Sequence, residues 1–92
     1  MIDFEWDEAK ADANLAKHGV RFADAAAVFD DPFALDFEDR SVDYGEIRRR
    51  IIGLADGRVL TVAYTERDET IRLISARKAT RTECREYNNA RW

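Results

Sequence analysis

The sequence predicts an α+β domain with two N-terminal helices, an antiparallel sheet of about four strands and a C-terminal helix. Three observations support this class: apolar residues recur at helical spacing in the first third, apolar and polar residues alternate from residue 33 onward, and a capping box precedes the last segment. The 92 residues contain no repeat, linker or low-complexity tract, so we expect residues 1–92 to form one domain.

The first helix is expected over about residues 8–18, between two residues suited to capping it. Asp7 can accept hydrogen bonds from the free amides of the first turn, and Gly19 can adopt the left-handed conformation that ends a helix. In the preceding segment 2–6, apolar residues alternate with acidic ones. That alternation is typical of a first strand, although a packed lead-in segment fits it as well.

A second helix is expected between Val20 and Pro32, because proline cannot continue a helix. Its apolar residues have the spacing of one buried stripe, namely Phe22, Ala25, Ala26 and Phe29. The chain then changes to the alternation of a half-buried strand, with Phe33, Leu35 and Phe37 on one face.

The rest of the sheet is expected as strands separated by turns with recognisable signals. In chain order these are a polar loop at 39–45, a strand at 46–55, a hairpin turn at Asp56-Gly57, a strand at 59–65, a turn at 67–69 and a strand at 70–77. Thr80 and Glu83 form the capping box, in which each side chain satisfies a terminal amide of a helix that runs to about Asn89.

One face of the first helix carries a polar stripe made of Lys10, Asn14, Lys17 and His18. Amine, amide and imidazole groups suit phosphate or a partner's carboxylates better than they suit a core. His18 is the single histidine of the chain and lies at the C-terminal end of the stripe. The helix dipole favours a histidine there for stability alone, so a catalytic and a structural role are both open. Lys17 beside it is either functional or simply solvated.

The net charge of −4 combines an acidic half with a basic half. Residues 1–46 hold 13 acidic and 4 basic residues, whereas residues 47–92 hold 6 acidic and 11 basic ones. The second half can therefore bind a polyanion, or the two halves can neutralise each other within one fold.

Composition also limits the compartment and the cofactors. The single cysteine, Cys84, excludes an internal disulfide and agrees with a reducing cytoplasm. No stretch approaches the roughly 20 apolar residues that span a bilayer, and the acidic start lacks the features of a signal peptide, so we expect a cytoplasmic protein without a membrane partner. One cysteine and one histidine are too few for a typical zinc site, and no metal or other cofactor is expected.

The polar residues of the second half suit the cleavage of RNA by its own 2′-hydroxyl group. That reaction needs no enzyme nucleophile, but it needs a base, an acid and cations around the phosphorane. Arg77 is the strongest candidate phosphate ligand, because the expected alternation places it at the end of the face that carries Ile71 and Leu73. Lys78 and Arg81 follow it closely in the sequence.

Arginine stays charged, so another residue must transfer the proton. The candidates are His18, Glu66, Glu46 and Tyr64. Glu66 and Arg67 form either part of the site or only a turn pair, and in a simple meander they need not meet Arg77. The arginine run 48–50 is expected to be a partly solvated edge or a set of salt-bridge partners for the acidic half.

A long gapped pattern runs through nearly the whole chain. In the first half it comprises Trp6-Asp7, Lys10, Asn14, Lys17-His18-Gly19-Val20, Phe22, Ala26, Val28-Phe29 and Asp31-Pro32. In the second half it comprises Glu46, Ile52-Gly53, Gly57-Arg58, Tyr64-Thr65-Glu66-Arg67, Ile71-Arg72, Ile74-Ser75-Ala76-Arg77, Glu83 and Tyr87. This pattern resembles the BrnT toxin family and is far more specific than any short motif.

The resemblance implies a toxin of a type II toxin–antitoxin system with a RelE-like fold, acting as an endoribonuclease that inhibits translation. It also implies a BrnA-like antitoxin with a ribbon-helix-helix domain, which joins the toxin in a heterotetramer or larger complex and itself binds the operator DNA. The residues carried over by matching position are Lys17, His18, Glu66, Arg67, Ser75 and Arg77. We assign catalytic roles to His18, Glu66, Arg67 and Arg77, and RNA binding to Lys17, Ser75, Lys78 and Arg81.

Two other interpretations stay open at this point. The chain can be a non-catalytic binding module whose basic half docks an acidic partner or nucleic acid. It can also be a degenerate toxin that serves as a co-repressor with its antitoxin.

Overall fold

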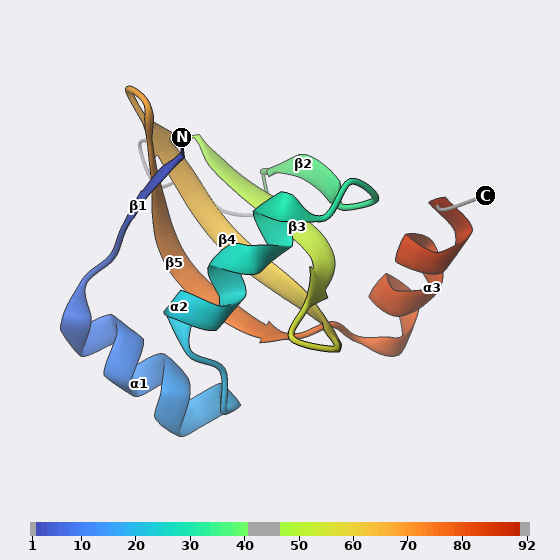
Figure 1. Ribbon diagram of the computed structural model, residues 1–92, viewed down its shortest axis with the longest axis horizontal. Coiled ribbons are helices and arrows are strands. Elements are labelled where there is room, and N and C mark those ends of the chain that lie inside the picture. The colour runs from blue at the N-terminus through green and yellow to red at the C-terminus, as the bar shows by residue number, and fades with distance from the viewer. Residues whose placement is uncertain (1, 41–46, 91–92) are drawn as a thin grey trace.

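Five strands and three α-helices form the described part of the chain, residues 2–40 and 47–90 of a computed structural model (Figure 1). In chain order the elements are β1 (Asp3–Glu5), α1 (Glu8–His18), α2 (Phe22–Ala25), the 3₁₀ helix η1 (Ala26–Asp30), β2 (Leu35–Asp39), β3 (Arg48–Ala55), β4 (Arg58–Arg67), β5 (Thr70–Lys78) and α3 (Arg81–Ala90). This arrangement confirms the predicted α+β class.

The strands form one mixed sheet in the order β1-β5-β4-β3-β2. Strands β2 to β5 make the predicted antiparallel meander, with the Asp56-Gly57 turn in left-handed conformation between β3 and β4. The N-terminal segment is β1, a strand that runs parallel to β5 over Thr70–Arg72. Of the two interpretations that the sequence allows for this segment, a strand or a packed lead-in, the strand is therefore correct. The sheet therefore has five strands and one parallel pair, instead of about four strands that are all antiparallel.

Helix α1 has the predicted bounds and both predicted caps. Oδ1 of Asp7 accepts a hydrogen bond from the Lys10 amide at 3.0 Å, and Gly19 has a φ of 68°. α1 packs against β5, while α2 and η1 cross in front of β5 and β3 (Figure 1). We call the surface of the sheet under these helices the helix face, and the opposite surface, which α3 contacts, the α3 face.

The prediction of one continuous second helix is wrong. α2 ends at Ala25, and the tighter 3₁₀ helix η1 follows it directly. η1 packs very closely on β3 because residue 53 is glycine: a Cβ at Gly53 would lie 3.2 Å from the carbonyl oxygen of Val28. Val28 is consequently fully buried, whereas Ala26 and Phe29 of the predicted stripe are only half-buried.

Strand β2 begins two residues later than predicted. Asp31 accepts a hydrogen bond from the Phe33 amide at 2.9 Å, which keeps this segment in a turn. Phe33 and Phe37, expected on a half-buried face, are 48% and 40% exposed. Asp39 was expected to open a loop and instead ends β2, while loop residues 41–45 and the expected strand residue at position 46 lie outside the described residues.

The main hydrophobic core lies between the helix face and the helices that cover it. Its buried members are Val20, Phe22, Ala25, Val28, Ile51, Ala55, Leu60, Val62, Tyr64, Leu73 and Ala76. Ile52 and Tyr87 are also buried but belong to the α3 side, outside this cluster. Apolar side chains are thus buried on both faces of the sheet, but most of them lie on the helix face.

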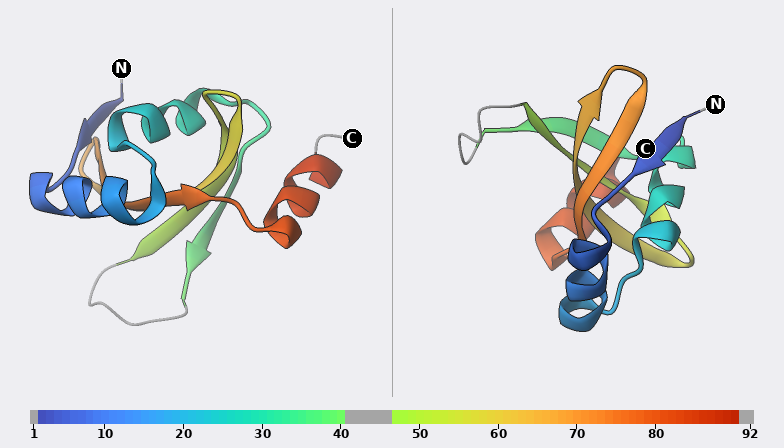
Figure 2. Two further views of the ribbon diagram at one scale, coloured as in Figure 1. Left: turned by 90° about the horizontal axis from the view of Figure 1, so that it is seen from below. Right: turned by 90° about the vertical axis from the view of Figure 1, so that its left-hand side faces the viewer.

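The two terminal helices lie far apart. α1 and α3 are at opposite ends of the long axis of the molecule (Figure 2). None of the helices in residues 2–40 and 47–90 is long and apolar enough to cross a membrane.

Candidate functional site

A β-bulge in β5 determines which of its side chains reach the α3 face. Ala63 of β4 pairs with Ser75, but the next residue, Tyr64, pairs with Leu73. Ile74 is therefore an extra residue on β5 with no partner of its own on β4. An extra residue reverses the alternation of side chains beyond it, because that alternation has a period of two.

The bulge corrects the predicted environment of Arg77. Leu73 and Ala76 both belong to the main core and Ile71 packs against it, although the sequence places Ala76 on the other face from Ile71 and Leu73. Ser75 and Arg77 point to the α3 face instead. The prediction that Arg77 continues the face of Ile71 and Leu73 is thus wrong.

On the α3 face, Arg77 binds a carboxylate of α3. Its Nη1 and Nη2 donate hydrogen bonds to Oε1 and Oε2 of Glu83 at 2.7 and 3.1 Å. Oε1 also accepts hydrogen bonds from the Thr61 hydroxyl at 3.1 Å and from the Thr80 amide at 2.8 Å. The Glu83 amide donates in return to Oγ1 of Thr80 at 3.2 Å, which confirms the predicted capping box. One carboxylate therefore joins β4, β5 and α3.

Arg50 is a second arginine at the same carboxylate. Its Nη1 lies 3.9 Å from Oε2 of Glu83, and its Nη2 donates to Oδ2 of Asp39 at 2.9 Å. The Arg50–Asp39 contact confirms the salt bridge expected between the arginine run and the acidic half. The approach of Arg50 to Arg77 has no signal in the sequence, because it results from the pairing of β3, β4 and β5. We call Arg50, Thr61, Arg77 and Glu83 the arginine–glutamate cluster.

Charges in the arginine–glutamate cluster are fixed at neutral pH. The hydrogen bonds from Arg77 lower the pKa of Glu83 to about 2, with smaller contributions in the same direction from the Thr80 amide and the Thr61 hydroxyl, while burial opposes them. The same pairing raises the pKa of Arg77 above its ordinary value. Glu83 is ionised and surrounded by donors, so it accepts a proton poorly in this arrangement. The cluster is chemically a site for an oxyanion, which Glu83 itself now fills.

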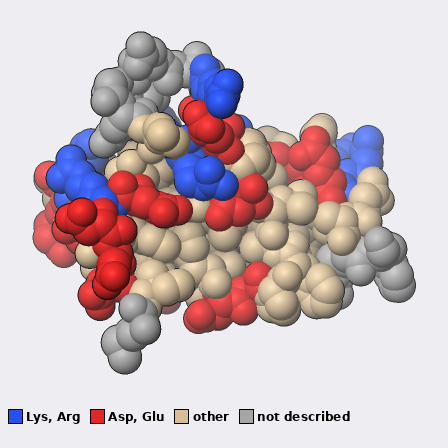
Figure 3. All heavy atoms as spheres, turned by 90° about the horizontal axis from the view of Figure 1, so that it is seen from above, with Lys and Arg blue, Asp and Glu red and all other residues tan. Residues whose placement is uncertain are grey.

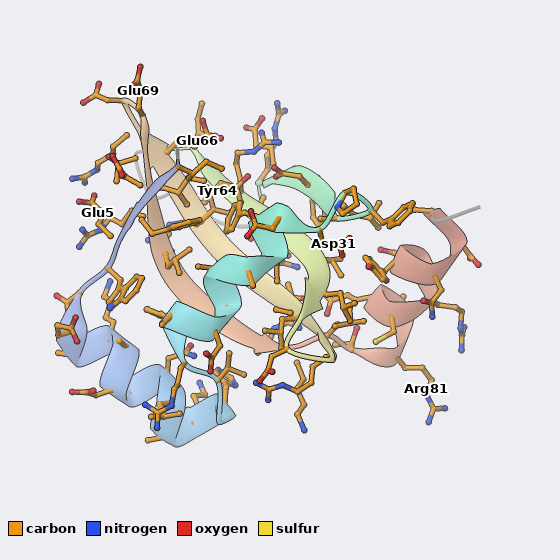
Figure 4. The ribbon with its side chains drawn as sticks, in the orientation of Figure 1. Glu5, Asp31, Tyr64, Glu66, Glu69 and Arg81 are labelled. Atoms are coloured by element: carbon orange, nitrogen blue, oxygen red, sulfur yellow. The ribbon has the colours of Figure 1, made fainter. Side chains whose placement is uncertain are left out.

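Tyr87 also attaches helix α3 to the rest of the domain. Tyr87 is 2% exposed, and its hydroxyl donates a short hydrogen bond to Oδ2 of Asp31. The same oxygen accepts the Leu54 amide at 2.8 Å. Figure 4 shows Asp31 on the side of η1 that faces α3, and Arg81 extending away from the sheet. The sequence shows Asp31 only as the end of a helix, so its second role was missed.

The polar stripe of α1 does not form one anion-binding face. Asn14 is 7% exposed, and its Nδ2 donates to the carbonyl oxygens of Val20 and Ala76 at 3.0 and 2.8 Å. Its Oδ1 accepts the Ala76 amide at 3.0 Å. The side-chain amide of Asn14 thus takes the place of a neighbouring strand on β5, beyond the segment paired with β1. The prediction is wrong for Asn14, because the main chain uses all of these polar groups.

Lys17 and His18 remain available from that stripe. Lys17 is exposed and His18 is half-buried. His18 follows Asn14 by one helical turn and so lies on the side of α1 that faces β5. In the described part of the chain, no hydrogen bond or ion pair joins His18 to Arg77.

The other predicted site residues lie at two ends of the sheet. Glu66 and Arg67 are exposed at the end of β4, where Arg67 pairs with Thr70. Arg77 is seven residues further along β5, which at about 3.3 Å per residue is roughly 20 Å. Figure 4 shows Glu66 beside the β4–β5 turn, far from Arg81 on α3. Ser75 therefore lies on the α3 face with Arg77, whereas Lys78 pairs with Leu60 and points to the opposite face. Arg81 extends away from the sheet, and Glu66 and Arg67 lie at its far end (Figure 4).

Tyr64, one candidate base, has a structural role. It is fully buried, and its hydroxyl donates to both carboxylate oxygens of Asp36, at 2.7 and 2.6 Å. Arg49 approaches the same hydroxyl at 3.3 Å. Burial, and then the hydrogen bond to Asp36, raise the pKa of Tyr64 well above its ordinary value. The phenol is therefore a donor locked in the core. Glu46, another candidate, lies outside the described residues.

The acidic and basic halves of the sequence neutralise each other in several places. Ion pairs join Arg49 to Asp36 at 3.2 Å and Arg72 to Glu5 at 3.6 Å, in addition to the Arg50–Asp39 pair. Figure 3 shows the two signs of charge interleaved on the side seen from above. Within residues 2–40 and 47–90, no three His, Cys, Asp or Glu side chains form a group that could hold a metal ion.

Comparison with known proteins agrees with the pattern of the sequence. A family model described as ribonuclease toxin, BrnT, of type II toxin-antitoxin system matches residues 6–83. The matched range includes every member of the arginine–glutamate cluster and ends at Glu83. No curated protein matches the chain.

Proposed function

The chain belongs to the BrnT family of ribonuclease toxins of type II toxin–antitoxin systems, and from this premise we propose that it is a metal-independent endoribonuclease whose phosphate site is the arginine–glutamate cluster. The observation that carries the proposal is the convergence of Arg50 and Arg77 on one carboxylate. A carboxylate and a phosphodiester both present a pair of oxygens to the fork of a guanidinium group. Thr61 supplies a third donor at the same point.

In the proposed reaction, the RNA provides the nucleophile. The 2′-oxygen attacks the adjacent phosphorus, the bond to the 5′-oxygen of the next nucleotide breaks, and the products carry a 2′,3′-cyclic phosphate and a 5′-hydroxyl. Arg77 and Arg50 stabilise the additional negative charge of the phosphorane. A base removes the proton of the 2′-hydroxyl, and an acid returns a proton to the leaving oxygen.

We assign proton transfer to His18 rather than to Glu66. α1 packs beside the part of β5 that leads into Arg77, as the Asn14–Ala76 hydrogen bonds demonstrate. Glu66 lies on β4 opposite Ile71, near the start of β5 and roughly 20 Å from Arg77 along the sheet. Its neighbour Arg67 then contacts a more distant phosphate of the same RNA. Ser75, Lys78, Arg81 and Lys17 contact the phosphates and riboses closer to the cleaved bond.

Family membership supports the cellular role that follows. We propose that RNA cleavage in the cytoplasm inhibits translation, and that a BrnA-like ribbon-helix-helix antitoxin neutralises the toxin in a heterotetramer. Operator DNA is then bound by the antitoxin alone. Expression of the chain without an antitoxin is expected to stop growth, and co-expression with the antitoxin is expected to restore it.

Cleavage of RNA in EDTA by the purified protein tests the enzymatic proposal. Products with 2′,3′-cyclic phosphate ends are expected, and Arg77→Ala should lower the rate by about 100-fold or more, the usual cost of removing one donor from a developing oxyanion. The matched control is Arg21→Ala, which removes the same charge from an exposed position at the start of α2, outside the arginine–glutamate cluster, and should leave the rate within about twofold.

Two results would contradict the proposal. RNA that stays intact, under conditions in which an active family member cleaves it, indicates a degenerate toxin or a binding module. Equal losses in Arg77→Ala and Arg21→Ala indicate a general effect of charge rather than a phosphate site at Arg77. Circular dichroism of both variants verifies that each is folded.

A further inference from the structure

We propose that α3 is a lid over the arginine–glutamate cluster, and that an RNA phosphodiester must displace the Glu83 carboxylate to reach Arg50 and Arg77. This lid role presupposes the proposed function, since it describes how RNA gains access to the same site. Opening of this lid, and the competition between carboxylate and phosphate, are separate from the chemistry of cleavage.

The first observation is that Glu83 occupies the binding fork of Arg77. Both terminal nitrogens of the Arg77 guanidinium donate to Glu83, one to each carboxylate oxygen. A phosphodiester that binds the same fork needs the same two donors. Glu83 and RNA therefore compete for Arg77, and the protein as it stands is in the closed state.

The second observation concerns electrostatics. The Arg50 and Arg77 side chains carry two positive charges, which Asp39 and Glu83 balance with two negative ones. With Glu83 in place, a negative charge lies directly at the Arg77 guanidinium and repels a phosphate that approaches it. Removal of Glu83 leaves one uncompensated positive charge on a surface that also presents the Thr61 hydroxyl. Opening of the lid thus creates the attraction for RNA and the space for it together.

The third observation is that α3 is held to the sheet by few contacts. Tyr87 is the buried residue of the helix, Glu83 and Cys84 are half-buried, and the other residues from Arg81 to Ala90 are exposed. Lifting α3 exposes Tyr87 and the α3 side of Ile52, and it breaks the contacts of Glu83 and the Tyr87–Asp31 hydrogen bond. The Ala79 amide stays bonded to the Val59 carbonyl at 3.0 Å, so the hinge is at Thr80.

Labelling of the single cysteine measures lid opening without RNA. Cys84 lies on α3 three residues before Tyr87, and a thiol reagent reaches it faster when the helix lifts. Glu83→Gln removes one attachment, and Tyr87→Phe removes the other without a change of charge. Each is expected to raise the labelling rate by about threefold or more, because each shifts the closed–open equilibrium. The control Glu86→Gln removes the same charge as Glu83→Gln from an exposed position on α3 and should label like the wild type.

Binding of a fluorescein-labelled 2′-O-methyl oligonucleotide measures the competition directly. This probe has the phosphodiester backbone but lacks the 2′-hydroxyl nucleophile, so binding is read without cleavage. We expect about tenfold tighter binding for Glu83→Gln, about threefold for Tyr87→Phe and less than about twofold for Glu86→Gln. Tyr87→Phe is the sharper test, since its gain cannot come from net charge.

The outcomes separate the lid from the ribonuclease activity. Equal affinities for Glu83→Gln and Glu86→Gln, together with wild-type labelling and affinity for Tyr87→Phe, overturn the lid even when the wild type cleaves RNA. Faster labelling and tighter binding in both lid variants support it even when no RNA is cleaved, and in that case the ribonuclease proposal is the one that fails.

Discussion

The two faces of the sheet are held to their helices by different kinds of contact. On the helix face, α1, α2 and η1 bury a continuous apolar cluster, including Phe22, Val28 and Leu73. On the α3 face, a helix with one buried residue is attached through a glutamate, two arginines and a tyrosine hydroxyl. Apolar burial is non-directional and has no simple competitor in water. On a partly exposed surface, by contrast, the carboxylate of an ion pair can be replaced by another anion of suitable shape.

We therefore expect the helix face to stabilise the domain and the α3 face to make contacts that other anions can replace. Substitutions on the helix face should lower the free energy of unfolding of the whole domain. Substitutions on the α3 face should mainly change the position of α3 and the affinity for anions. Three further measurements test this division.

The largest loss of stability is expected for Asn14→Ala. The substitution leaves the amide and the carbonyl of Ala76 buried without their partners, at an expected cost of about 3 kcal/mol in the free energy of unfolding. Urea denaturation followed by circular dichroism measures it. The control Lys10→Ala on the same helix should change stability by less than about 0.5 kcal/mol. Similar small effects in both variants would show that α1 is not essential to the helix face.

A smaller loss, about 2 kcal/mol, is expected for Gly53→Ala, because overpacking a tight core contact typically costs 1–3 kcal/mol. The added Cβ would lie 3.1 Å from Cβ of Ala34 and 3.2 Å from the backbone oxygen of Val28. The second substitution Ala34→Gly removes the first contact and should recover part of the loss in a double-mutant cycle. Full stability in Gly53→Ala itself would contradict the close packing of η1 on β3.

Acid should weaken the α3 face first. The pKa of Glu83 is about 2 in the folded chain, against 4.5 for an unperturbed glutamate, so its stabilising contribution is complete above about pH 4.5 and is lost as the pH falls toward 2. Between pH 5 and pH 3 we expect Glu83 to account for about 1–2 kcal/mol of the loss in the free energy of unfolding.

Comparison of variants isolates that contribution from the other carboxylates. Urea denaturation at both pH values should show a smaller loss for Glu83→Gln than for the wild type, while Glu86→Gln should follow the wild type. The same pH dependence in all three proteins would mean that the arginine–glutamate cluster contributes nothing to stability.

Local signals made much of the fold predictable. Both ends of α1 were predicted correctly, because Asp7 and Gly19 cap main-chain groups that lie only a few residues away in the sequence. The Asp56-Gly57 hairpin and the capping box at Thr80 were recognised for the same reason. The prediction failed where tertiary contacts matter: the second helix changes to η1, which packs closely on Gly53 of β3, and no local pattern shows that contact.

The candidate site was less predictable than the fold. Arg77 was selected from the sequence, but its face was wrong, since a bulge depends on how β4 and β5 pair. Arg50 and Thr61 were missed because only the assembled sheet places them beside Arg77. Glu83 was recognised as a cap, and its contact with Arg77 needs the turn at Ala79–Thr80 to bring α3 back over the sheet.

The hydrogen bonds of Asn14 with Ala76 have a consequence for solubility. A sheet edge with unpaired main-chain groups invites a strand from another molecule, and β1 covers only Thr70–Arg72 of β5. Because the Asn14 side chain bonds to both main-chain groups of Ala76, a strand from another molecule cannot pair with β5 at that residue. At the other edge, the acidic side chains of β2 are paired within the chain, Asp36 with Arg49, Glu38 with Arg40 and Asp39 with Arg50. One side-chain amide therefore closes β5 at Ala76 to a strand from another copy of this toxin.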